Sequence, residues 1–139
     1  MKLIIGLFLV VNLFANDKVS MYKLYQNLEY EKACDLGLKI FHKNRQDENF
    51  LSLYAFSCLQ SDNINRLALP IANLKYYKES RPNASYFSVI LMQKKLLYHA
   101  LIDGYDLKSL NLPTTDYVLS KVFDSYAKLE NTEKKPYYI

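Results

Sequence analysis

Two cysteines, Cys34 and Cys58, are the residues of this sequence best suited to covalent chemistry. In an oxidising compartment such a pair forms a structural disulfide, whereas a thiolate of lowered pKa acts as a nucleophile or redox group. The C-x-x-C spacing that favours redox catalysis is missing. We therefore expect a structural bridge, with two buried free thiols as the other structural interpretation. A thiol-dependent envelope redox enzyme is an alternative of a different class.

The other residue types give no indication of an active site. His42 and His99 are the only histidines, and neither has a cysteine or carboxylate at the spacing of metal ligands. After the N-terminal apolar run only Gly37 and Gly104 remain, so the sequence has neither a glycine-rich phosphate loop nor a G-x-S-x-G nucleophile elbow. We expect no catalytic residues, no metal, no cofactor and no enzymatic activity.

Composition is typical of one globular domain with an ordinary solvated surface. The chain has 139 residues, 50% of them hydrophobic and 23% charged. Its formal net charge is +4, and lysines alternate with acids instead of forming a basic stripe. Because nucleic-acid binding depends on clustered cations that displace counterions, we expect no nucleic-acid partner.

The first 15 residues have the pattern of a secretory signal. Lys2 precedes an apolar run from Leu3 to Phe14, and the small Ala15 is followed by polar residues. The run is shorter than the ~20 apolar residues that a membrane-spanning helix needs. We therefore expect a signal peptide over residues 1–15, cleaved after Ala15, and a periplasmic or secreted protein. Retention of the run as a membrane anchor is the alternative.

The remaining sequence predicts helices, because glycine and proline are few and apolar residues recur three and four positions apart. The segment from Phe50 to Leu59 is apolar almost all round, so we expect it to be the most buried. Asn83 is placed to cap a helix that starts at Ala84, and Gly104 to end it. The predicted helices span residues 18–28, 30–41, 50–59, 64–74, 84–103 and about 116–129, and residues 131–139 form a flexible tail.

Two of these helices carry further expectations. Pro70 interrupts the stripe of residues 64–74 and would kink the helix, unless the helix begins only near Leu69. The last helix has one apolar face and one polar face that we expect to contact solvent, as in a terminal capping helix. The residues of its predicted core face are Val118, Leu119, Val122, Phe123 and Tyr126.

A shift of 34 residues superposes the apolar pattern of the first two helices on the next two. It lays Tyr22 on Phe56 and Gly37 on Ile71. This period resembles the tetratricopeptide repeat, and the segment EYEKA at residues 29–33 is similar to that family's turn and second helix. The segment KACDLG at residues 32–37 also resembles Sel1-like repeats. The resemblance implies an all-α fold over residues 16–130, with antiparallel hairpins in a short right-handed array and a C-terminal capping helix.

Antiparallel helices would also bring the cysteines together. The loop between the second and third predicted helices is centred near residue 46, and Cys34 and Cys58 lie equally far from that centre. Equal offsets along antiparallel helices place two residues at the same height. We therefore predict a Cys34–Cys58 disulfide.

The resemblance further implies a partner-binding groove, because the first helices of successive tetratricopeptide hairpins line a concave surface. Phe56 is a candidate anchor for a peptide, or alternatively a core residue. The groove positions carried over from the family are Tyr22, Ser52, Phe56, Tyr86 and Gln93.

These expectations together predict an exported, non-catalytic protein–protein interaction module, acting as an adaptor or assembly factor of the cell envelope. Its partner would be another envelope protein or a peptide segment. The alternative within binding functions is a membrane-anchored accessory subunit of an envelope complex. That alternative applies only if the N-terminal segment is retained.

Overall fold

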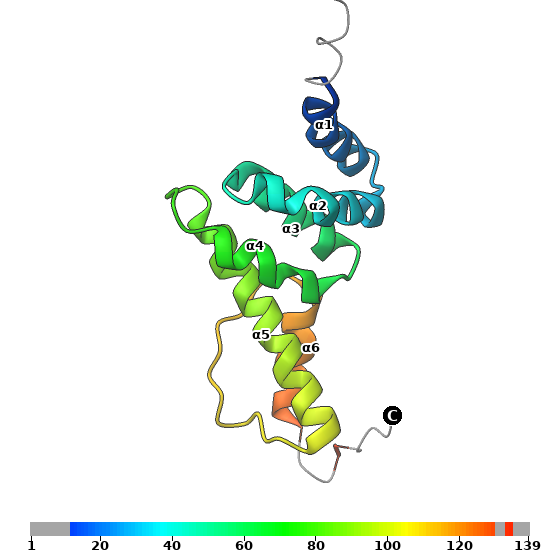
Figure 1. Ribbon diagram of the computed structural model, residues 1–139. Helices are drawn as coiled ribbons and strands as arrows, with labels where there is room; N and C mark the ends of the chain where they lie inside the picture. Colours follow the sequence, from blue (N-terminus) through cyan, green and yellow to red (C-terminus); the bar gives the residue numbers. More distant parts are fainter. Residues whose placement is uncertain (1–11, 130–132, 135–139) are drawn as a thin grey trace, which may run out of the picture.

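The computed structural model describes residues 12–129 and 133–134, and every regular element in this part of the chain is a helix (Figure 1). The predicted all-α class is confirmed at this level. Most of the predicted signal peptide and of the predicted tail lies outside the described residues. The helices are α1 (Asn12–Gln26), α2 (Tyr30–Asn44), α3 (Glu48–Gln60), the 3₁₀ helix η1 (Ile64–Leu67), α4 (Ala68–Asn73), α5 (Arg81–Asp103) and α6 (Val118–Lys128).

Helices α1, α2 and α3 pack against one another, and α2 makes the most extensive contacts with α3. Cys34, near the start of α2, is bonded to Cys58, near the end of α3, so these two helices run in opposite directions. The ammonium of Lys18 on α1 lies 2.6 Å from the carboxylate of Asp47, just before α3. This contact places the first part of α1 beside the turn between α2 and α3.

Helices α1 and α3 end in the same backbone motif, 34 residues apart. After α1, Leu28 adopts a left-handed conformation with φ 62°, and the N–H of Glu29 donates to the carbonyl of Leu24. After α3, Asp62 has φ 58°, and the N–H of Asn63 donates to the carbonyl of Cys58. Each is a Schellman ending, which satisfies helix carbonyls that otherwise lack a partner.

Helix α3 has the largest number of buried residues of any helix, as its all-round apolar sequence predicts. Asp47 caps its N-terminus by accepting a hydrogen bond from the N–H of Phe50 at 3.1 Å. The ring of Tyr54 on α3 packs directly on the backbone of Gly37 on α2. Any Cβ at position 37 would be too close to that ring. Glycine at this position therefore permits the close approach of α2 and α3.

The predicted helix over residues 64–74 is divided into η1 and α4, and Pro70 explains the division. Because α4 begins at Ala68, Pro70 is its third residue. The N–H groups of the first helical turn have no acceptor within the helix, so proline removes no hydrogen bond there. The alternative in which the helix starts near Leu69 is thus close to the observed start of α4 at Ala68.

Helix α5 begins before the predicted cap. Pro82 occupies its first turn, and Asn83 lies inside the helix, where its side-chain amide donates to the Ser52 hydroxyl at 3.1 Å. The expected capping role of Asn83 is therefore wrong, because proline is favoured in the first helical turn and moves the start upstream. Gly104 ends α5 as predicted, with φ 69° and its N–H bonded to the carbonyl of Ala100.

The second half of α5, the connecting segment and α6 form a smaller apolar cluster, separate from the main core around α3. In Figure 1 this pair of helices extends away from α1, α2 and α3. Phe123 of α6 is buried in the cluster, but Val118 and Val122 are exposed. Their predicted place on the core face is wrong, because α6 is rotated so that the small Ser120 faces α5 instead.

Candidate functional site

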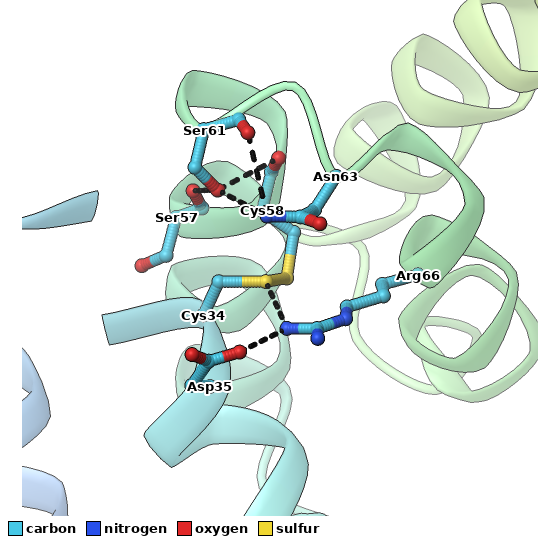
Figure 2. A network of polar contacts seen from close by, with 7 residues as sticks. All are labelled: Cys34, Asp35, Ser57, Cys58, Ser61, Asn63 and Arg66. Carbon is cyan, nitrogen blue, oxygen red and sulfur yellow. Dashed lines mark hydrogen bonds and ion pairs between the residues drawn. A yellow bond between two sulfur atoms is a disulfide. The ribbon is translucent and has the colours of Figure 1, made fainter. Parts of the chain in front are cut away.

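The disulfide between Cys34 and Cys58 lies at a corner between α2, α3 and η1 (Figure 2). The two sulfur atoms are 2.01 Å apart and the two Cα atoms 4.8 Å apart. This is the pairing predicted from equal offsets along antiparallel helices. Both cysteines are fully buried. Since thiol–disulfide exchange requires access for the attacking thiolate, the corner does not favour the alternative of a thiol-dependent enzyme.

Arg66 of η1 joins the disulfide to the surface. Its guanidinium donates to the carboxylate of Asp35 at 2.5 Å and to the sulfur of Cys34 at 3.3 Å (Figure 2). Arg66 and Asp35 lie 31 residues apart in the sequence, so local spacing does not predict this ion pair. The corner therefore connects η1 to α2 by charge and α2 to α3 by a covalent bond. We interpret it as a structural site.

Two of the five predicted groove residues line adjacent hollows on the surface. Tyr22 of α1, which is 52% exposed, borders a hollow of about 330 Å³ formed with Phe50 and Leu53 of α3. Ser52 borders a second hollow of about 520 Å³ together with Tyr77, Glu79 and Ser80 of the loop before α5 and Asn83 of its first turn. Asp47 and Asn49 line both hollows, so the two are neighbours along the first half of α3.

Phe56 and Tyr86 pack against each other instead of lining an open groove. The ring of Phe56 lies 4.9 Å from that of Phe87 and 6.5 Å from that of Tyr86, and both Phe56 and Tyr86 are half-buried. The hydroxyl of Tyr86 donates to the carboxylate of Asp116 at 2.8 Å. Burial, followed by this hydrogen bond and the charge of Asp116, raises the pKa of Tyr86 to about 12. Phe56 is thus partly a core residue.

Gln93 is not a groove residue. It is fully buried, and its amide group donates to the carbonyl of Pro113 at 3.1 Å and accepts from the hydroxyl of Ser120 at 2.6 Å. A buried amide needs such partners, and here they come from the connecting segment and α6. The prediction is wrong because α6 and the segment before it cover this face of α5. The resemblance to tetratricopeptide repeats predicts that the same face is exposed.

Sequence reasoning missed Glu48, the first residue of α3. Its side chain is buried, and its carboxylate accepts hydrogen bonds from three successive N–H groups, those of Lys75 at 3.1 Å, Tyr76 at 2.6 Å and Tyr77 at 3.2 Å. The hydroxyl of Ser80 donates to the same carboxylate. Glu48 thus fixes the loop between α4 and α5 to the start of α3.

The hydrogen bonds also keep Glu48 charged. Burial by itself would raise the pKa of its carboxyl group, but the bonds from Ser80 and from the backbone of residues 75–77 outweigh burial and lower the pKa. A glutamate at the start of a helix is ordinarily read as compensation of the helix dipole. Only the tertiary contact with a loop 27 to 32 residues further along distinguishes Glu48 from that ordinary case.

The two histidines lie apart from these features. His99 stacks on Tyr105 with ring centroids 4.4 Å apart, and His42 makes an edge contact with Phe41. Among the described residues, no three histidine, cysteine or acidic side chains gather as metal ligands would. Within the same residues, none of the helices combines the length and apolarity required to cross a bilayer.

Comparisons of the chain with protein-family models, with curated proteins and with solved structures found no match.

Proposed function

We propose that this chain is an exported, non-catalytic interaction module that serves as an adaptor or assembly factor of the cell envelope. The observation that carries the proposal is the pair of adjacent hollows along α3, bordered by the half-exposed Tyr22 and by Ser52. Concave surfaces with an accessible aromatic side chain suit the capture of a protein segment, because aromatic anchors supply much of the contact energy.

A degenerate tetratricopeptide-like arrangement is part of this proposal. Two observations support it: the left-handed residues Leu28 and Asp62 end α1 and α3 at a separation equal to the 34-residue period, and Lys18 and Asp47 hold α1 beside the start of α3. In such an arrangement α1 and α3 are the first helices of successive hairpins, and the surface they share would be the partner-binding face.

Site-specific cross-linking tests the partner-binding face. A photoreactive amino acid in place of Tyr22 should capture an envelope partner in cells, whereas the same group in place of Tyr98 should not. Tyr98 is a matched control because it is similarly exposed, at 58%, and lies far along α5. Phe56 is unsuitable for this test, because its contact with Phe87 makes it part of the packing. Equal patterns of cross-linked products at positions 22 and 98 would refute the proposed face.

Export is tested separately by sequencing the N-terminus of the protein purified from an envelope fraction. Cleavage after Ala15 should leave Asn16 as the first residue. Helix α1 begins at Asn12, so cleavage would remove only the first residues of the helix. Recovery of the uncleaved chain in the membrane fraction would instead support the membrane-anchored accessory subunit.

A further inference from the structure

The loop between α4 and α5 presents two tyrosines to solvent from a firmly held backbone. Tyr76 is 65% exposed and Tyr77 is 60% exposed, although the N–H groups of both residues are bonded to the buried carboxylate of Glu48. Arg81 also donates to the carbonyl of Tyr76 at 3.3 Å. These bonds hold the backbone of the loop, from which the two rings extend into solvent.

Cations flank the two tyrosines. Lys75 and Lys78 are exposed on either side of the pair, and the ammonium of Lys75 lies 5.2 Å from the centroid of the Tyr76 ring. The order Lys-Tyr-Tyr-Lys combines amphipathic rings with strongly hydrated charges. Tyrosine is enriched at the boundary between lipid and water, and lysine is attracted to anionic headgroups.

The turn between α2 and α3 lies on the same side of the molecule (Figure 1), and there Lys18 and Arg45 balance the charges of Asp47 and Glu48. Glu48 is bonded to the α4–α5 loop, and Asp47 is paired with Lys18, so both acids are engaged within the fold. We call the set Lys18, Arg45, Asp47, Glu48, Lys75, Tyr76, Tyr77, Lys78, Glu79 and Arg81 the basic edge; its five cations exceed its three acids.

The hollow at the opposite ends of α2 and α3 has the reverse character. The hollow at that end is lined by Glu29, Glu31 and Asp62, with Lys32 as its one basic side chain. Charge is therefore distributed asymmetrically across the molecule, although its net value is small. An asymmetric field of this kind orients a protein toward an anionic surface.

We propose that the basic edge docks on an anionic phospholipid surface, with Tyr76 and Tyr77 at the level of the headgroups. The argument for lipid as the partner is the complementarity of charge together with two rings that project from the tip of a loop. Two adjacent exposed rings flanked by lysines suit the deformable, amphipathic headgroup layer of a membrane. The basic edge adjoins the partner-binding face, because Lys18, Asp47, Glu48, Tyr77 and Glu79 also line its two hollows. The lipid contact does not depend on whether the N-terminal run is retained.

The absence of tryptophan from the sequence allows a direct test on the full chain. Tyr76→Trp places a single fluorescent indole at the proposed contact, and Tyr98→Trp places one about 25 Å further along α5 as the control. Vesicles of phosphatidylcholine containing one part in four of phosphatidylglycerol should shift the emission of Trp at position 76 to the blue and protect it from an aqueous quencher. Trp at position 98 should be unaffected, even if the N-terminal run attaches the chain to the vesicle.

Charge variants in the Tyr76→Trp background separate a specific contact from general adhesion. The double change Lys75→Gln with Lys78→Gln should weaken vesicle binding of the loop about 25-fold, since each lysine near an anionic surface contributes roughly a factor of five. Raising the salt concentration should weaken it further. Lys121→Gln with Lys128→Gln, two exposed lysines of α6, is the matched control and should change vesicle binding little. Unchanged emission from position 76, or equal shifts at positions 76 and 98, would overturn the proposal.

Discussion

Glu48 shows how one side chain can position a loop that lies far along the chain. Its carboxylate replaces water as the partner of three successive N–H groups in the loop between α4 and α5. Hydrogen bonds to a charged acceptor are stronger than neutral ones. The exposure of Tyr76 and Tyr77 at the basic edge therefore depends on a residue that is itself hidden.

Replacing this carboxylate should destabilise the fold. We expect Glu48→Ala to lower the free energy of unfolding by about 3 kcal/mol, because it removes several hydrogen bonds to a charged acceptor, including one from the buried Ser80 hydroxyl. Urea denaturation of the two proteins measures the difference. Glu79→Gln, an exposed acid of the same loop, is the control and should change stability little. A loss as small for Glu48→Ala as for the control would contradict the role assigned to the carboxylate.

The lowered pKa of Glu48 also predicts the direction of acid sensitivity. A carboxyl group whose pKa is lower in the folded state stabilises the fold fully above its ordinary value of 4.5. That contribution is lost as the pH falls through the lower pKa of the folded state. The unfolding free energy of the natural chain should therefore fall more steeply below about pH 4.5 than that of Glu48→Gln, which has no proton to gain at this position.

Leu28 adopts a left-handed backbone conformation that is unfavourable for a leucine. It adopts positive φ while 69% exposed, so it is strained by its Cβ and gains little from burial. We expect Leu28→Gly to raise the unfolding free energy by about 0.5–1 kcal/mol, because glycine adopts this conformation without that strain. Leu38→Gly, at an exposed position inside α2, should instead lower it by about 1 kcal/mol. A loss of stability in both variants would refute the strain at Leu28.

At the scale of elements, the disulfide holds α2 against α3 about one turn from the close approach of Tyr54 to Gly37. Arg66 adds η1 to the same corner through Asp35. Covalent cross-links stabilise mainly by restricting the unfolded chain, and packing of the two helices already places the cysteines side by side. The bridge thus reinforces an arrangement that the core dictates.

We expect the double change Cys34→Ala with Cys58→Ala to lower the unfolding free energy by about 3 kcal/mol, by the loop-entropy estimate for the closed segment. The helices should still form, so circular dichroism of the native state should be nearly unchanged. Mass spectrometry of the unreduced natural chain provides the companion measurement. Alkylation of two thiols without reduction would show that the bridge is absent.

At the scale of the whole molecule, two apolar clusters are joined by α5 and by a few long-range hydrogen bonds. Tyr117, just before α6, makes the clearest of these bonds, since its hydroxyl donates to the carboxylate of Asp62 at 2.8 Å, with the carbonyl of Leu59 at 3.3 Å. Burial, then the hydrogen bond and charge of Asp62, raise its pKa to about 12. This contact attaches α6 to the end of α3.

Tyr117→Phe should loosen α6 without disturbing α2 and α3. We expect a loss of about 1 kcal/mol, the typical contribution of one hydrogen bond, and faster amide exchange in α6 than in α3. A tyrosine with a raised folded pKa stabilises the fold fully below its ordinary value of 10.0, and this contribution is lost as the pH rises towards about 12. The natural chain should therefore lose more stability over this interval than Tyr117→Phe. Equal losses would indicate that the hydroxyl has no part in docking α6.

The sequence by itself determined the elements of this protein and one long-range contact. Periodicity and the scarcity of glycine and proline determined the helical class, Gly104 determined the end of α5, and equal offsets from one loop determined the Cys34–Cys58 pairing. These features follow from local backbone preference or from the regular rise of two adjacent helices. Such information is present within a few turns of sequence.

Only the tertiary structure decided which faces became buried. Gln93 and Val122 were assigned to the wrong environments because the rotation of α6 about its axis depends on a buried bond between Ser120 and Gln93. Glu48 was overlooked because its donors lie in a loop whose position no local pattern records. The physical reason is common to these residues: a polar side chain is satisfied by whatever packs against it, and that neighbour is fixed only when all helices are in place.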